Sequence, residues 1–209
     1  MSAVPRFPLA VLPTPLVAAT RLGAALGDAA PLLVKRDDLI GFGVAGNKAR
    51  PLEYLVGAAR EQDVEVLVTA GGPGSNFCAA AALAAKVAGM ACEIVLWGEP
   101  AGAPNVELAV AAGARILPTG RPARAEVDVL AAERAAELTA AGTRAVAVPR
   151  GGSTPIGALG FLDAGRELAG QIREQLRGTV PSAIVLPVGS GGSCAGLLAG
   201  LAAAGLAAP

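Results

Sequence analysis

The sequence predicts an α/β fold in which helices cover layers of parallel strands. Apolar runs of roughly four to six residues, typical of buried strands, alternate along the chain with alanine-rich segments long enough for helices. Glycine-rich turns join several of these strands to the helix that follows, where the chain must reverse tightly. The 209 residues are enough for one large domain or two small ones with a substantial core.

The first expected elements are an extended entry segment and a strand. The prolines of 12–16 favour extended backbone, and the apolar run at 32–36 predicts a strand that ends before two aspartates. A glycine-rich turn over 41–48 comes next. It opens directly into a predicted helix at 51–60.

A regular alternation of strands and helices fills the rest of the chain. Apolar runs predict strands at 64–69, 92–97, 115–117, 145–148 and 183–188. The segments between them predict helices at 76–89, 105–112, 123–141, from the turn 151–157 to about 177, and at 194–208. Gly113 is expected to end the second of these helices. The order of the strands within the sheet does not follow from these patterns.

Composition excludes several classes of function. Lysine and arginine balance aspartate and glutamate at seventeen each, so no basic surface for nucleic acid or an anionic membrane is expected. The chain has no histidine, which excludes Ser-His and Cys-His nucleophile systems and most zinc sites. We therefore expect no metal centre, and acid–base chemistry must use lysine, carboxylate, tyrosine, a hydroxyl or a cofactor.

Cysteine usage and hydropathy indicate a soluble cytoplasmic protein. The three cysteines, Cys78, Cys92 and Cys194, are odd in number and widely spaced, which suits small buried side chains in a reducing cytosol. The N-terminus lacks the apolar run of a signal peptide. The uncharged stretch 178–209 is interrupted by Pro187 and several glycines. About fifteen apolar residues remain after them, fewer than the ~20 that a membrane span needs.

Lys48 is the candidate nucleophile. It ends the glycine-rich turn 41–48 and is one of only three lysines, beside fourteen arginines. A chain that uses arginine for its ordinary surface charge makes each lysine worth testing for a special role. Arginine cannot form an imine, whereas a deprotonated lysine amine attacks a carbonyl. The alternative is that Lys48 carries ordinary surface charge.

The loop Gly189-Ser-Gly-Gly-Ser193 is the candidate phosphate site. It follows an apolar run and opens a predicted helix, so backbone N–H groups and the helix N-terminus converge there, with Ser190 and Ser193 as further donors. The spacing is neither that of a dinucleotide fingerprint nor that of a P-loop, which favours a compact monophosphate. The alternative is a tight turn without a ligand.

A third glycine-rich turn, at 71–76, places Ser75 and Asn76 at the start of a predicted helix. These residue types favour an N-cap, and they are equally suited to face the carboxylate or ring hydroxyl of a ligand. A lysine turn, a phosphate loop and a polar helix start together suggest pyridoxal phosphate, which needs a lysine for its aldehyde and an anion site for its phosphate.

Five motifs carry a family resemblance, in the same order along nearly the whole chain. They are Lys35-Arg-Asp-Asp-Leu39; Gly46-Asn-Lys-Ala-Arg50 with Leu52-Glu53; Thr69-Ala-Gly-Gly72 with Ser75-Asn76; Gly151-Gly-Ser153 with Gly157-Ala-Leu-Gly160; and Gly189-Ser-Gly-Gly-Ser193 with Ala195-Gly-Leu197. The chain thereby resembles the D-cysteine desulfhydrase and 1-aminocyclopropane-1-carboxylate deaminase group. This group lies within the tryptophan-synthase-β-like enzymes, which use pyridoxal phosphate and have fold type II.

The resemblance implies roles for the candidate residues. Lys48 would bind the cofactor aldehyde and then move a proton, and Asn76 would hydrogen-bond the cofactor ring oxygen. Gly189, Ser190, Gly191, Gly192 and Ser193 would hold the phosphate, and Ser75 with its neighbours would receive the substrate carboxylate. The implied fold has two parallel-sheet α/β layers. A smaller domain at 51–149 is inserted in a larger one formed by 1–50 and 150–209, and a C-terminal part is absent.

The implied reaction is a β-elimination or deamination of a small amino acid to a 2-oxo acid and ammonia. Two departures matter. Where family members usually read Gln-Ser-Asn-His-x-Arg, this chain reads Gly74-Ser-Asn-Phe-Cys-Ala79, so the substrate does not carry over. Family members also continue for roughly another hundred residues. A homodimer is the family expectation; a partner chain that completes the site, and an inactive remnant or scaffold, are the alternatives.

Overall fold

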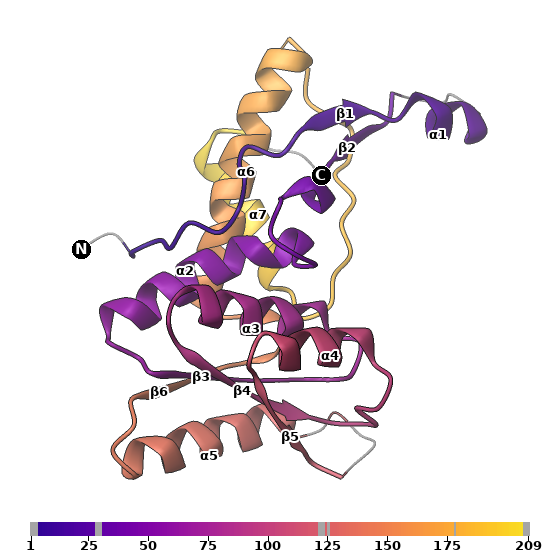
Figure 1. Ribbon diagram of the computed structural model, residues 1–209. Helices are drawn as coiled ribbons and strands as arrows, with labels where there is room; N and C mark the ends of the chain where they lie inside the picture. Colours follow the sequence, from indigo (N-terminus) through magenta and orange to yellow (C-terminus); the bar gives the residue numbers. More distant parts are fainter. Residues whose placement is uncertain (1–3, 28–30, 121–123, 125, 178, 207–209) are drawn as a thin grey trace.

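The computed structural model describes residues 4–27, 31–120, 124, 126–177 and 179–206. Its described residues form a four-stranded parallel sheet with helices on both faces, a two-stranded antiparallel ribbon and a pair of packed helices (Figure 1). The α/β class expected from the alternation of strands and helices is confirmed.

The parallel sheet contains four of the predicted strands. These are β3 (Val66–Gly71), β4 (Ala91–Leu96), β5 (Arg115–Pro118) and β6 (Ala145–Val148), in the order β5-β4-β3-β6. All six residues of the central strand β3 are buried, as a strand covered on both faces requires. Because all strands run in one direction, their carboxyl ends share an edge, where the turn after β3 leads to Ser75 and Asn76.

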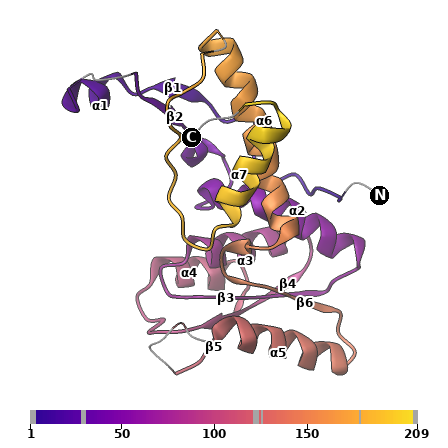
Figure 2. The same cartoon turned by 180° about the vertical axis from the view of Figure 1, so that it is seen from behind.

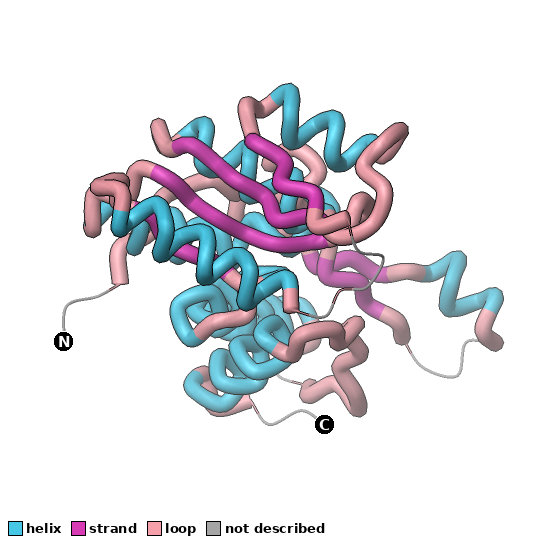
Figure 3. The backbone as a smooth tube through the Cα atoms, turned by 90° about the horizontal axis from the view of Figure 1, so that it is seen from below, coloured by secondary structure: helices cyan, strands magenta, loops and turns pink. Residues whose placement is uncertain are grey.

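Alternating side chains of the strands build two cores, one on each face of the sheet. Leu67, Ile94 and Leu96 pack with α2 (Ala49–Glu61), α3 (Asn76–Val87) and α4 (Pro104–Ala111). Val66, Val68 and Val95 pack with α5 (Val127–Ala140) on the opposite face. Figure 3 shows the strands (magenta) with helices (cyan) on both sides of them. These helices match the predictions within a few residues; the predicted start of the last one, at 123, lies outside the described residues.

The remaining helices are α6 (Pro155–Gln175), which packs against α2, and α7 (Gly192–Ala203), which packs against α6 (Figure 2). Glycines allow their backbones to touch. A Cβ added to Gly196 would lie 2.3 Å from the carbonyl oxygen of Ala158, and one added to Gly200 would lie 2.0 Å from that of Leu162. The backbone contact therefore fixes α7, with the loop that precedes it, on α6. The last predicted helical residues, 207 and 208, lie outside the described residues.

The strand predicted at 183–188 is wrong for this chain. These residues form no regular element, and Val185 and Val188 are 93% and 63% exposed. A strand needs a hydrogen-bonded neighbour, and no strand of the described residues pairs with this segment. The apolar pattern is strand-like, but the pairing partner that would order it is missing from the described part of the structure.

The N-terminal region adds elements that the sequence did not predict. β1 (Leu16–Ala18) pairs antiparallel with β2 (Leu33–Lys35), which is the strand expected at 32–36. A short helix, α1 (Thr20–Ala25), lies between them, and this arm projects from the body in Figure 1. The second sheet within the described residues is therefore an antiparallel ribbon and not a second parallel layer. The division into two domains, with boundaries at 51 and 149, stays a prediction.

Two further findings concern the described residues as a whole. None of the helices there is both long and apolar enough to cross a membrane. No group of three or more acidic or cysteine side chains in that part of the chain is arranged to hold a metal ion. Cys78 and Cys92 are buried as expected, whereas Cys194 is only half-buried.

Candidate functional site

Lys48 is the last residue of a 3₁₀ turn, η2 (Gly46–Lys48), and leads directly into α2. The side chain is half-buried, and its amine makes no hydrogen bond or ion pair with any residue that the structure describes. Burial lowers the pKa of Lys48 below the ordinary lysine value of 10.5. A larger share of this amine is therefore neutral, which is the form that attacks a carbonyl.

Ser75 and Asn76 lie at the start of α3, as predicted. The Ser75 hydroxyl accepts a hydrogen bond from the backbone N–H of Cys78 at 3.2 Å, so Ser75 is the N-cap of the helix. Asn76 is exposed, and its Oδ1 accepts a hydrogen bond from Nδ2 of Asn105 at 2.8 Å. Sequence reasoning did not find Asn105, because nothing in the sequence places α4 beside this turn.

The cap makes a testable contribution to stability. Replacing Ser75 with alanine is expected to lower the free energy of unfolding by about 1 kcal/mol, because the N–H of Cys78 loses its acceptor. Ser75→Asn keeps a capping oxygen and is the matched control, expected to change stability by only a few tenths of that amount. Urea unfolding followed by circular dichroism measures both variants. Equal stability of Ser75→Ala and the unmodified chain would contradict the capping role.

The loop Gly189–Ser193 leads into α7, which begins at Gly192 after Gly191 in the left-handed region with φ 88°. The first N–H groups of a helix have no intrahelical acceptor. The hydroxyls of Ser190 and Ser193 make no hydrogen bond with the residues that the structure describes. The predicted donors are therefore present at the helix N-terminus, although the strand expected before them is not.

The turn η3 (Arg150–Gly152) and Ser153 join the candidate segments. A Cβ on Gly152 would lie 2.9 Å from atoms of both Leu55 in α2 and Phe77, the residue after Asn76. A Cβ on Gly192 would lie 2.8 Å from Oγ of Ser153, and that hydroxyl donates to the carbonyl of Ser190 at 3.3 Å.

The fold thus brings three of the glycine-rich segments into contact around η3, and η2, which carries Lys48, packs against α3. Lys48 itself has no hydrogen bond to Ser75, Asn76 or the loop 189–193 among the described residues. The structure places these groups in one region without joining them directly.

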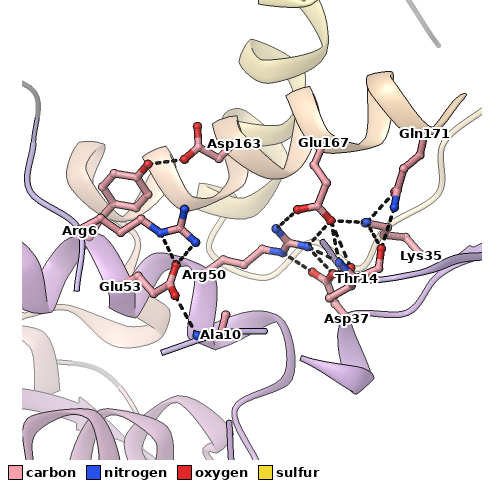
Figure 4. Close-up of polar contacts among 11 residues, drawn as sticks. Arg6, Ala10, Thr14, Lys35, Asp37, Arg50, Glu53, Asp163, Glu167 and Gln171 are labelled. Atoms are coloured by element: carbon pink, nitrogen blue, oxygen red, sulfur yellow. Dashed lines mark hydrogen bonds and ion pairs between the residues drawn. The ribbon is translucent and has the colours of Figure 1, made fainter. Parts of the chain in front are cut away.

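A buried ionic cluster, centred on Arg50 two residues after Lys48, was not expected. Arg50 lies between Asp37 and Glu167, and Lys35 also contacts Glu167 (Figure 4). A second group on α2, Glu53, accepts hydrogen bonds that tie down the N-terminal segment, from Arg6, Leu9 and Ala10. Lys35, Asp37 and Arg50 belong to the first two family motifs, but no local pattern in the sequence places them beside one another.

Comparison with known proteins gives the family. A model described as "Pyridoxal-phosphate dependent enzyme" matches residues 8–209. The chain belongs to this family. The resemblance drawn from the five motifs is confirmed, and so is pyridoxal 5'-phosphate as the family's cofactor.

Three curated relatives are similar over nearly all of this chain. A "Putative 1-aminocyclopropane-1-carboxylate deaminase" of Pyrococcus abyssi is 36% identical over 97% of this chain and 60% of its own length. A "D-cysteine desulfhydrase" of Salmonella paratyphi B is 33% identical, over 94% of this chain and 60% of its own. A "Nocardicin C-9' epimerase" of Nocardia uniformis is 38% identical, over 99% of this chain and 62% of its own length.

A solved structure shows the same fold. The chain superposes on an "ACC deaminase homologue" with a TM-score of 0.84 and 36% identity, covering 94% of this chain and 58% of that one. The chain therefore spans about 60% of the length of the relatives it resembles.

The residues present fit pyridoxal phosphate. The amine of Lys48 has no partner among the described residues and a pKa lowered by burial, which suits a group that binds an aldehyde. The start of α7 offers N–H groups and two hydroxyls for a phosphate. Because Asn105 bonds to Oδ1 of Asn76, the Nδ2 group of Asn76 is left to donate to a ring oxygen.

Proposed function

We propose that this chain forms the cofactor-binding part of a pyridoxal-phosphate-dependent lyase or deaminase. Its substrate would be a small amino acid, and its products a 2-oxo acid and ammonia. The observation that carries the proposal is the amine of Lys48, which is half-buried, has no partner among the described residues and has a lowered pKa at the start of α2. The names of two relatives, a deaminase and a desulfhydrase, support the reaction class.

Each candidate residue has a distinct task in this proposal. Lys48 would bind the cofactor aldehyde and would also take a proton from the substrate or return one to it. Asn76 donates to the ring oxygen. The loop Gly189–Ser193 holds the phosphate. When bound, pyridoxal phosphate supplies an aldehyde and a ring that accepts electrons.

Ser75 can cap α3 and contact substrate at the same time. Its oxygen accepts from the N–H of Cys78, and its hydroxyl hydrogen, which also faces the Cys78 thiol, would turn to donate to a substrate carboxylate. The N-terminus of α3, which Ser75 caps, can also face this carboxylate with its backbone N–H groups. The residues that follow Asn76 here are Phe77, Cys78 and Ala79, so no basic side chain on this stretch contributes to substrate recognition.

The experiment that tests the function is a panel of turnover assays. The purified chain with added pyridoxal phosphate is incubated with D-cysteine, L-cysteine, D-serine and 1-aminocyclopropane-1-carboxylate, and ammonia and 2-oxo acid are measured. Release of both products in equal amounts from one of these substrates is expected. Racemisation of an amino acid without release of ammonia would contradict the lyase reaction and indicate an epimerase instead. One of the relatives is named as an epimerase.

A partner-dependent form of the same function is the second candidate. The exposed apolar segment at 183–188 favours it, because Val185 is 93% exposed just before the phosphate loop. The partner would be a polypeptide that corresponds to the part of the relatives beyond this match. If this form is correct, activity is expected only after the chain is mixed with that partner polypeptide. Turnover by the pure chain would exclude it. We place either form in the cytoplasm, where its free cysteines stay reduced.

A further inference from the structure

Arg50 lies two residues after Lys48, and only 1% of it is exposed. Its Nε and Nη2 each donate to the Asp37 carboxylate at 2.8 Å, and its Nη1 and Nη2 donate to Glu167 at 3.1 Å (Figure 4). Burial opposes the charge of Arg50, but the bonds to these carboxylates outweigh burial and raise its pKa. The guanidinium therefore stays charged and paired.

The Asp37 carboxylate belongs to the segment beside the Lys48 turn. Asp37 begins η1 (Asp37–Leu39), which packs against η2, and a Cβ on Gly46 would lie 3.9 Å from the Asp37 carbonyl oxygen. The other acid of η1, Asp38, is paired with Arg36 at 2.7 Å. Arginines thus occupy both carboxylates of η1, and Lys48 is left without an acidic partner.

The carboxylates of α2 and α6 that lie nearest to this turn are also paired with cations. On α2 the carboxylate of Glu53 is paired with Arg6 at 2.6 Å, and on α6 Glu167 is shared between Arg50 and Lys35. The charged residue of α3 is Lys86, which is exposed and positive. Of the other carboxylates, Asp163 on α6 is paired with Arg166 at 3.5 Å, and Glu61 is the last residue of α2, at the end opposite to Lys48.

We propose that Arg50 is a positioning residue for Lys48: by holding the Asp37 carboxylate, it keeps the lysine amine unpaired and able to react. The proposal rests on the proposed function of Lys48. A carboxylate that paired with this amine would stabilise its ammonium form, which cannot attack an aldehyde. Arg50 holds both oxygens of Asp37 in a fork that a lysine cannot reproduce.

The test measures the reactivity of Lys48 in the full chain without any cofactor. Acetic anhydride modifies neutral amines, and peptide mass spectrometry gives the rate at each lysine across a pH series, with exposed Lys86 as the internal reference. Arg50→Met is expected to slow the modification of Lys48 about tenfold near neutral pH, because the freed Asp37 carboxylate would stabilise the ammonium form of the lysine. Adding Asp37→Asn is expected to restore the original rate.

The double variant separates this role from a purely structural one. A slow Lys48 that stays slow in Arg50→Met/Asp37→Asn would overturn the proposal, as would an unchanged rate in Arg50→Met. If Arg50→Met does not fold, Arg50→Lys replaces it, with a smaller slowing that Asp37→Asn again reverses; an unchanged rate there also overturns the proposal. Because no cofactor is present, the result does not depend on whether Lys48 is the residue that binds it.

Discussion

Lys48→Ala is expected to abolish covalent binding of pyridoxal phosphate and to lower any turnover by about a thousandfold or more. The amine is the group that joins the aldehyde, and the other two lysines are unsuited to replace it. Lys35 is tied to Glu167 and Gln171, and Lys86 lies exposed on α3. Because the Lys48 amine has no partner among the described residues, stability should change by only about 0.5 kcal/mol.

The measurement is the visible absorbance of the lysine-bound cofactor, followed by borohydride reduction and peptide mass spectrometry. The unmodified chain is expected to carry the reduced cofactor at Lys48, and Lys86→Ala is the matched control that keeps both the band and the label. Lys48→Arg retains the positive charge but not the chemistry, and should behave like Lys48→Ala. A band that persists in Lys48→Ala and survives dilution would show that another group binds the aldehyde.

The sequence predicted those parts of the fold that depend on local patterns. The strands β3, β4, β5 and β6 were found because each is a short apolar run between turn residues, whereas the order in which they pair did not follow from the sequence. Lys48, Ser75 and the loop 189–193 were predicted as site residues in a similar way, from a scarce residue type and from glycine-rich turns before helices.

The failures share one physical cause, which is dependence on distant partners. The run at 183–188 has the composition of a strand, but a ladder needs a neighbour that the described residues do not supply. Arg50 and Glu167 are 117 residues apart in sequence, so no local pattern predicts their ion pair. Asn76 was correctly placed at a helix start, whereas its partner Asn105 became visible only once α4 was folded beside it.

Gly160→Ala is expected to destabilise the chain by about 2 kcal/mol or more, because the added methyl group would enter the backbone of α2. A Cβ at Gly160 would lie 2.2 Å from the carbonyl oxygen of Arg50 and 2.7 Å from the nitrogen of Pro51. Neither atom can move without shifting the start of α2, which carries Lys48. The same variant should therefore also weaken binding of pyridoxal phosphate.

Gly170→Ala is the matched control, in the same helix and with the same chemical change. A Cβ at Gly170 meets nothing within 4 Å, so alanine should stabilise α6 there by up to about 1 kcal/mol through its helix propensity. Urea unfolding of both variants should place them on opposite sides of the unmodified chain. If Gly160→Ala were as stable as Gly170→Ala, α6 would not be in backbone contact with α2. The contact between these two helices would then not fix the position of Lys48.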